Sequence, residues 1–553
     1  MIGRVKAVTA FTAVLLVSAG AFALFGITND NDAQSDNSTI GATHTVVVYE
    51  NILLSNFGGS GNDRFYAVEA TPDGGFVSVG IFSTGLNWSP GDWIGLTPMG
   101  SFNAAIAKFD EDGKVEWVNN FGGNGNDRFF GVTLAADGGF VAVGDSYSNS
   151  IGTGDWTGMT QKSNLSDAII VKFDKHGDLE WRNNFGGAGM NNFAAVASAP
   201  DGGFIAVGFS DMTDPGIGDW AGVTPKGTRD AIIVKFDQHG SIEWMNNFGG
   251  TGSNSFSDLI IDNDGNIIAV GSSDYKSFGT GDWTGVEGNG DRDAIIVKFC
   301  PLGDVIWETN FGGEGLDWFM GITVTHDNRL VAVGYSYYQS FGTGDWTGIE
   351  ENGDRDAIIV KFCPLGDVIW KTNFGEEDFF IFRSVTESPN GTFVAVGYRS
   401  DTNHSNSILN LIGDIDAIIA SFDYSGKLVW SGGINSEGNS LSRGATSTVN
   451  GNIILVGYAN SASFGTGDWY NTPGKGGLDA ILGIWTPIIT TITEPDNEPD
   501  TASIVMLIIN IVVAILLMAA VVASILSKNP HIAGILVAAA IGIFFLGFFE
   551  VFK

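Results

Sequence analysis

A short Asp-Trp motif flanked by glycines recurs through the middle of this 553-residue chain. It reads GTGDWTG at 152–158, 279–285 and 342–348, with the variants GDWIG at 91–95, GDWAG at 218–222 and GTGDW at 465–469. An indole ring can stack on the face of a sugar, and a neighbouring carboxylate can accept hydrogen bonds from its hydroxyls. The motif therefore supplies six candidate ligand-binding pairs: Asp92 and Trp93, Asp155 and Trp156, Asp219 and Trp220, Asp282 and Trp283, Asp345 and Trp346, Asp468 and Trp469.

The same tryptophans have a structural interpretation, which the repetition favours. A structural need recurs with the repeating unit, so each indole is also a candidate peg that closes its own loop against a neighbouring unit. A second tryptophan series lies on expected strands, and we interpret it as packing between units: Trp117, Trp181, Trp244, Trp307, Trp370 and Trp430. For the Asp-Trp series, both a packing role and a ligand-stacking role remain open.

Few other residues suggest chemistry. Asp63, Asp127 and Asp317 lie in the glycine-rich phrases FGGSGND, FGGNGND and FGGEGLD and are weak candidate calcium ligands. Calcium prefers six to eight oxygens, and no unit shows a complete ligand-spaced loop. The sequence also has no nucleophile elbow, phosphate-binding loop or metal-binding histidine spacing. We therefore expect no catalytic residues, no enzyme activity and no cofactor other than calcium.

The two cysteines are not expected to form a disulfide. Cys300 and Cys363 occupy equivalent positions in two copies of the phrase KFCPLGDVIW. Equivalent points in adjacent units of a repeat fold lie farther apart than the roughly 7 Å between Cα atoms that a disulfide allows.

The elements that carry these residues repeat with a period of 63 or 64 residues. NFGG begins at Asn56, Asn120, Asn184, Asn247 and Asn310, and DAIIVKF begins at Asp167, Asp230, Asp293 and Asp356. Seven units span residues 44–485, and each contains four short strand signals separated by Gly/Asp turns. In the second unit these signals are 129–135, 140–146, 167–174 and 178–185.

Four strands repeated seven times predict an all-β fold, a seven-bladed β-propeller of four-stranded blades. A solenoid of stacked units is the alternative. The last unit ends after its third strand at Trp485, and residues 46–59 supply the missing fourth strand, so the two segments are expected to close a ring. In this topology the two long loops of every unit share one face, the long-loop face, where we expect binding.

Units such as NNFGGNGNDRFFGVTLAADGGFVAVGDS, continued by SDAIIVKFDKHGDLEWRNNFGG, resemble the prokaryotic seven-bladed β-propeller repeat family. The resemblance covers all seven units. It implies a secreted or surface-anchored protein more than a defined activity, because most members lack one. The KFD…G…W segment also bears a weaker resemblance to the tryptophan-docking segment of quinoprotein propeller blades.

The ends of the chain predict attachment to a membrane. Residues 1–27 form a signal peptide or signal anchor and 28–43 a linker, while 486–502 form a stalk rich in Thr, Pro and acidic residues. The apolar runs 503–526 and 532–549 predict a transmembrane helical hairpin in the lipid bilayer. Lys528 between them and Arg4 and Lys6 at the N-terminus place the propeller outside the cell.

Charge and repetition narrow the expected function. A net charge of −35 argues against a nucleic-acid partner, which requires a basic surface. We expect an extracellular binding or adhesion module for a surface polysaccharide or an envelope protein, acting through the long-loop face. The alternatives are a surface enzyme acting on glycans, with carboxylates near the sixth unit, and a structural envelope component without a ligand.

Overall fold

The computed structural model describes residues 26–27, 43–83, 89–211, 217–400, 411 and 413–493. The chain divides into two compact units, and Val48–Ile488 belongs to the first. In the second, β1 (Gly26–Ile27) pairs antiparallel with the beginning of β2 (Thr43–Phe57). No helix among the described residues has the length and apolarity to cross a membrane, and the predicted spans at 503–526 and 532–549 lie outside those residues.

The described residues of the first unit form seven groups of four antiparallel strands, here called blades 1 to 7. Blade 1 contains β3 (Arg64–Ala70), β4 (Phe76–Ser83), β5 (Phe102–Phe109) and β6 (Val115–Phe121). Blade 2 contains β7 (Asp127–Leu134), β8 (Phe140–Tyr147), β9 (Ser166–Phe173) and β10 (Leu179–Phe185). Blade 3 contains β11 (Asn191–Ser198), β12 (Phe204–Asp211), β13 (Arg229–Phe236) and β14 (Ile242–Phe248). Blade 4 contains β15 (Asn254–Ile261), β16 (Ile267–Asp274), β17 (Arg292–Phe299) and β18 (Val305–Phe311).

The remaining blades follow the same order. Blade 5 contains β19 (Asp317–Val324), β20 (Leu330–Tyr337), β21 (Arg355–Phe362) and β22 (Val368–Phe374). Blade 6 contains β23 (Phe379–Glu387), β24 (Phe393–Ser400), β25 (Ile415–Phe422) and β26 (Leu428–Ile434). Blade 7 contains β27 (Ser440–Ser447), β28 (Ile453–Asn460), β29 (Leu478–Thr493) and β2. Strand β29 continues to Thr493, so residues 486–493 of the predicted stalk are strand.

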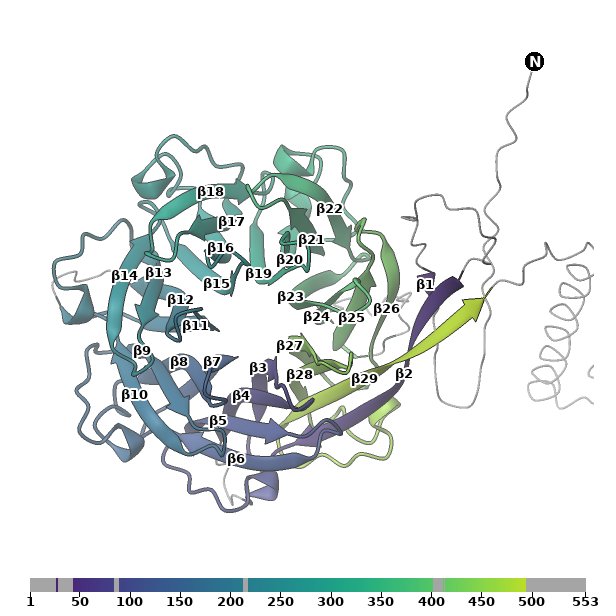
Figure 1. Cartoon of the computed structure of the whole chain (residues 1–553), viewed down its shortest axis with the longest axis horizontal. Coiled ribbons are helices and arrows are strands. Elements are labelled where there is room, and N and C mark those ends of the chain that lie inside the picture. Colours follow the sequence, from purple (N-terminus) through teal and green to yellow (C-terminus); the bar gives the residue numbers. More distant parts are fainter. Residues whose placement is uncertain are drawn as a thin grey trace, which may run out of the picture. The chain divides into compact units, whose positions relative to one another are not determined.

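The blades form a closed ring. Their first strands neighbour one another in the order β3, β7, β11, β15, β19, β23, β27 and back to β3, and they surround the centre of the ring in Figure 1. Strand β2 pairs with β29 as the outermost strand of blade 7. The described residues therefore form an all-β propeller, and its predicted closure by the first and last segments is confirmed.

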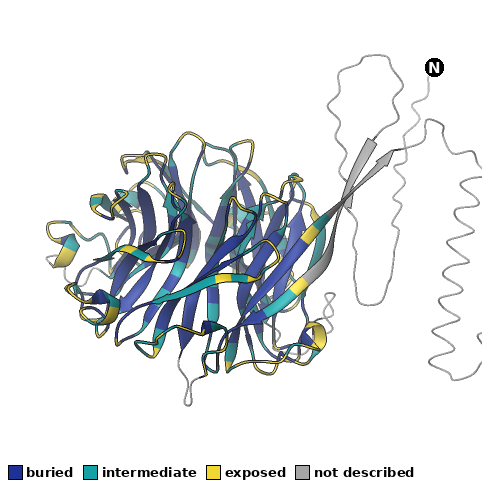
Figure 2. Cartoon of the chain, turned by 60° about the horizontal axis from the view of Figure 1, so that its bottom comes forward, coloured by how far each residue is buried: buried dark blue, intermediate teal, exposed yellow. Residues whose placement is uncertain are grey.

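Hydrophobic cores fill the spaces between neighbouring blades. One cluster, for example, joins Val141 and Ile170 of blade 2 to Phe204 and Ile232 of blade 3. Because both faces of each middle strand are covered, the AIIV run of DAIIVKF is continuously hydrophobic instead of alternating, and all eight residues of β9 are buried. Figure 2 shows the buried residues within the sheets and the exposed residues mainly in the connecting loops.

Tryptophans of the second series dock each blade onto the next. Trp117 on β6 covers Gly177 in the turn between β9 and β10, where an added Cβ would lie 2.6 Å from the indole. Its Nε1 donates to the carbonyl oxygen of Lys175 at 3.2 Å. Leu53 on β2 takes the corresponding place against Gly113. The predicted packing between blades is confirmed for five indole–glycine pairs: Trp117–Gly177, Trp181–Gly240, Trp244–Gly303, Trp307–Gly366 and Trp370–Gly426.

Candidate functional site

The Asp-Trp motifs fold into short 3-10 helices that join the two long loops of a blade interface. Their bounds are η1 (Gly91–Trp93), η2 (Gly154–Trp156), η3 (Gly218–Trp220), η4 (Gly281–Trp283), η6 (Gly344–Trp346) and η7 (Gly467–Trp469), while η5 (Tyr338–Ser340) lies outside the motif. In η2 the backbone N–H of Asp155 donates to the Gly122 carbonyl oxygen at 2.8 Å. The N–H of Gly122 donates back to Asp155 Oδ2 at 3.0 Å. Both long loops thus lie on one face, as predicted.

The six indoles of this series are buried. Their exposed fractions are 0% for Trp93, Trp156, Trp283, Trp346 and Trp469 and 1% for Trp220. Phenylalanines of the NFGG phrases meet them edge-on, as Phe311 meets Trp346 with ring centroids 5.0 Å apart. No indole face is open to solvent in this arrangement, which suits a packing peg better than a stacking platform.

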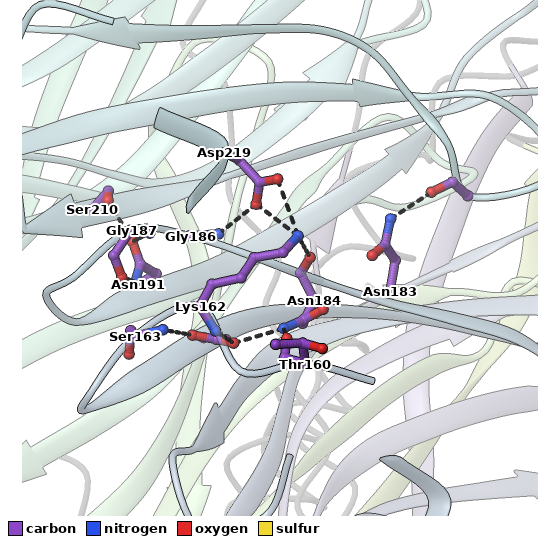
Figure 3. Close-up of polar contacts among 12 residues, drawn as sticks. Thr160, Lys162, Ser163, Asn183, Asn184, Gly186, Gly187, Asn191, Ser210 and Asp219 are labelled. Carbon is purple, nitrogen blue, oxygen red and sulfur yellow. Dashed lines mark hydrogen bonds and ion pairs between the residues drawn. The ribbon is translucent and has the colours of Figure 1, made fainter. Parts of the chain in front are cut away.

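The neighbouring carboxylates are held by the preceding blade. Lys162 of blade 2 reaches across to Asp219 of blade 3, with Nζ 2.8 Å from Oδ2, and also donates to the Asn184 carbonyl oxygen at 2.5 Å (Figure 3). Lys226 holds Asp282 at 2.6 Å, and Lys475 holds Asp92 at 2.6 Å. These contacts secure the long loops, so a ligand contact by the six aspartates stays a prediction.

The candidate calcium ligands lie in three separate blades. Asp63, Asp127 and Asp317 are each fully buried and accept a hydrogen bond from the adjacent glycine-rich loop and another from the indole of their own blade. Among the described residues, no three His, Cys, Asp or Glu side chains are grouped as a metal site. The geometry thus gives these acids a loop-closing role. Cys300 and Cys363 are free, as predicted.

Acidification should stabilise the propeller through these carboxyls. Burial raises the pKa of Asp63 and of Asp317 to about 7. An unfolded aspartate titrates near pKa 3.9, so the folded state binds more protons between about pH 4 and pH 7, and its stability falls as the pH rises through this window. We expect a higher urea midpoint at about pH 5.5 than at about pH 8.

The matched control replaces both acids by Asn, the residue that blades 3 and 4 carry at this position as Asn191 and Asn254. An Asp63→Asn/Asp317→Asn variant should show a smaller change of midpoint between the two pH values. Equal pH dependence in variant and wild type would refute the assignment.

A cavity of about 730 Å³ occupies the centre of the ring. Its lining comes mainly from the first strands, at positions that differ from blade to blade. In every blade, one residue of the first strand pairs with a glycine that recurs in the second strand, and the next residue faces the cavity. From blade 1 to blade 7 this next residue is Tyr66, Phe130, Ala194, Ser257, Met320, Arg383 and Arg443. The third strands, by contrast, repeat nearly unchanged.

Arginines line this channel, and others lie over aromatic rings of the same propeller. Arg128, Arg229, Arg383 and Arg443 line the cavity. Arg64, Arg292 and Arg355 are not lining residues but lie over the rings of Tyr458, Trp318 and Tyr337, at 4.8, 5.2 and 4.3 Å from the centroids. These seven residues are called the channel arginines below. Stacking of a guanidinium on an aromatic face favours the charged form and fixes its plane.

Two carboxylates also face the cavity, Glu69 on β3 and Asp258 on β15. Burial raises the pKa of each to about 7, and the charge of Asp258 adds to the shift of Glu69. Asp258 accepts hydrogen bonds from the backbone N–H of Ile322 at 3.0 Å and of Leu259 at 2.9 Å. Near neutral pH both acids are therefore partly protonated, which reduces the negative charge inside the channel.

No residue that lines the channel was among the predicted site residues. The predicted site residues recur from unit to unit, whereas the channel is lined by residues that differ between units. The sequence does contain a signal for the channel. The strand that follows each NFGG loop varies from unit to unit, whereas the other strands of the unit change little.

Comparisons with known proteins give distant similarities. No family model matches the chain, so membership of the prokaryotic propeller repeat family stays a prediction. A 258-residue segment is 22% identical to an uncharacterized WD repeat-containing protein of Acanthamoeba polyphaga mimivirus, covering 39% of this chain and 18% of that protein. A 205-residue segment is 25% identical to the regulatory protein FlaEY of Caulobacter vibrioides, covering 36% and 21%. The matches thus span about a fifth of the length of these relatives.

Among solved structures, Kuenenia stuttgartiensis hydrazine synthase aligns with a TM-score of 0.38 at 10% identity, over 80% of this chain and 98% of that chain. The β-propeller domain of the Trilobed protease from Pyrococcus furiosus aligns with a TM-score of 0.37 at 8% identity, over 79% and 100%.

Proposed function

We propose that the propeller is a binding module whose ligand enters the central channel from the long-loop face. One observation carries this proposal: the residues that break the repeat are gathered around one cavity of about 730 Å³. A structural need recurs in each blade, whereas a single binding site requires different residues from different blades. Cavities of this size that combine apolar rings with a few polar groups are typical of ligand sites.

The ligand class we propose is a surface polysaccharide or an envelope protein, bound by a propeller held outside the cell by the predicted membrane hairpin. The name of the mimivirus relative, a WD repeat-containing protein, is compatible with an interaction module. The channel provides both aromatic faces, such as Trp318 and Phe130, and hydrogen-bond donors. Aromatic faces suit sugar rings, which makes the polysaccharide the better-supported ligand.

Narrowing the channel should abolish binding without unfolding the protein. Ala194 and Ser257 are small residues that face the cavity from blades 3 and 4. We expect an Ala194→Trp variant to lose binding to the glycans that the wild-type chain retains on a glycan and envelope-protein array, with an unchanged melting temperature. The control is Ala221→Trp, an exposed position of the long-loop face outside the cavity. Loss of binding in the control alone would instead place the site on the rim.

A surface enzyme acting on glycans is the second candidate function, because Glu69 and Asp258 bring two carboxyls with a pKa of about 7 to the same cavity. General acid catalysis needs a carboxyl that is protonated near neutral pH. Release of reducing ends from a bound glycan, lost in Glu69→Gln but not in Glu111→Gln on an exposed turn, would favour this alternative. Saturable binding without turnover favours the binding module.

A further inference from the structure

The channel arginines differ in how their charge is balanced. Arg128 forms an ion pair with Asp145 at 2.5 Å, and Arg229 with Asp211 at 2.7 Å. Among the described residues, none of the other channel arginines has a carboxylate within ion-pair distance; these are Arg64, Arg292, Arg355, Arg383 and Arg443. Their side-chain hydrogen bonds go to neutral groups: tyrosine hydroxyls, a serine and a methionine sulfur.

This lack of acidic partners is unexpected for the composition. The chain has 62 acidic residues against 27 basic ones, so carboxylates are abundant. Four of the five lysines at the matching position of the third strands contact carboxylates, as Lys235 contacts both Asp201 and Glu243. The fifth, Lys361, lies over the ring of Tyr424. A partly buried cation without an anion loses hydration that neutral partners replace only in part. Five of the channel arginines therefore lack an ion-pair partner, although Glu69 and Asp258 face the same cavity.

Three of these arginines form a continuous arc across blades 6, 7 and 1. Arg383 and Arg443 line the cavity from neighbouring first strands, and Arg443 and Arg64 lie over the same Tyr458 ring at 5.7 and 4.8 Å. The Nε atoms of all three are buried without a hydrogen-bond partner. Burial, together with the nearby charge of Arg443, lowers the pKa of Arg383. Like charges are thus held side by side, at a cost in stability.

We propose that Arg383 and Arg443, with Arg64 beside them, form an oxyanion site that binds the acidic groups of an anionic polysaccharide. This inference rests on the proposed binding function and narrows its ligand to acidic glycans. The planar fork of a guanidinium matches a carboxylate or a sulfate through two parallel hydrogen bonds. The rings of Tyr66 and Tyr458 lie against the guanidinium of Arg443 and help to fix its plane. Carboxylated and sulfated glycans share this chemistry, and the experiment separates them.

The test titrates the full chain with three probes: oligogalacturonate for the carboxylate, dextran sulfate for the sulfate and neutral dextran as the uncharged polymer. We expect binding of at least one acidic probe, weakened by salt, and none of neutral dextran. An Arg383→Gln/Arg443→Gln variant should bind that acidic probe at least about tenfold more weakly. The control is Arg182→Gln on the outer strand β10, which also has a buried Nε without a partner and should bind as wild type does.

Stability gives a second, independent readout. Removing two unbalanced charges should leave the melting temperature of the double variant equal to or above that of the wild type, so loss of binding cannot be ascribed to misfolding. The acidic probe should raise the melting temperature of the wild type and of Arg182→Gln, but not that of the double variant.

The outcomes also separate this inference from the proposed function. If the double variant binds the acidic probe as tightly as the wild type, or if neither acidic probe binds, the oxyanion site is refuted. If Ala194→Trp then still abolishes binding of another glycan, the channel remains a binding site and only the acidic specificity fails. If neither acidic probe binds and no other ligand responds to Ala194→Trp, both the site and the proposed function fail.

Discussion

Replacing Trp346 by Ala should lower the free energy of unfolding by about 3–5 kcal/mol, the usual cost of removing a large buried aromatic side chain. Trp346 is fully buried, packs edge-on against Phe311 at 5.0 Å and contacts Phe341 at 5.0 Å. Its Nε1 donates to Asp317 Oδ1 at 3.2 Å and to Ser336 Oγ at 3.1 Å. The substitution therefore leaves a cavity and deprives a buried carboxyl of a donor.

The matched control is Trp318→Ala in the same blade. Trp318 is only partly buried, on the channel side of β19, so truncation there should lower the urea midpoint much less. The same measurements also distinguish a packing role of the Asp-Trp tryptophans from a ligand-binding role. If Trp346→Ala melts like the wild type while glycan binding disappears, the Asp-Trp series is a ligand platform after all, and the burial seen here is not its resting arrangement.

The fold was predictable because each blade satisfies the same physical requirements. The centre of the DAIIVKF strand must be apolar on both faces, since the blades pack face to face. The turn between β9 and β10 must carry a glycine at position 177, because a Cβ there would collide with the indole of Trp117. Because these packing requirements recur in every unit, they appear in the sequence as a repeat of 63 or 64 residues. The missing fourth strand of the last unit predicted closure by the same logic, and β2 supplies it.

The candidate site was not predictable in the same way. Arg383, Arg443 and Arg64 are far apart in the sequence and are brought together only by closure of the ring. At the position of Arg383 and Arg443 the other five blades carry Tyr, Phe, Ala, Ser and Met, so no motif marks it. The Asp-Trp motif, by contrast, is conspicuous because the loop interface it closes exists at nearly every blade junction. Repetition in this chain thus marks structure, and departure from repetition marks the candidate site.

Blade 6 departs from the repeat for a structural reason. Its sequence lacks the Asp-Trp motif, and Arg399 takes the position at which blades 2 to 5 carry serine. The strand register shows this: Arg399 pairs with Asp416 as Ser336 pairs with Asp356. In blade 5 that serine contacts the buried indole of Trp346. Arg399 and the buried Leu411 thus occupy the part of the core that an indole fills elsewhere.

Replacing Arg399 by Met should therefore be one of the most damaging single changes in the propeller. Its side chain is 1% exposed and lies 3.5 Å from Asp378 and 3.3 Å from Asp416, which are 1% and 0% exposed. It also donates to the Leu411 carbonyl oxygen at 3.1 Å. Removing one partner of a buried charge network leaves buried charge uncompensated, and the expected loss is about 3–5 kcal/mol in the free energy of unfolding.

Neutralising the two acids should restore much of this loss. An Arg399→Met/Asp378→Asn/Asp416→Asn variant removes the uncompensated charges, so its urea midpoint should lie between those of Arg399→Met and the wild type. Arg329→Met, in an exposed ion pair with Asp327, is the control and should change the midpoint little. If Arg399→Met instead keeps the wild-type midpoint, Arg399 does not hold the core together. The break in the repeat at blade 6 would then again be a candidate for the carboxylate site of a glycan-active enzyme.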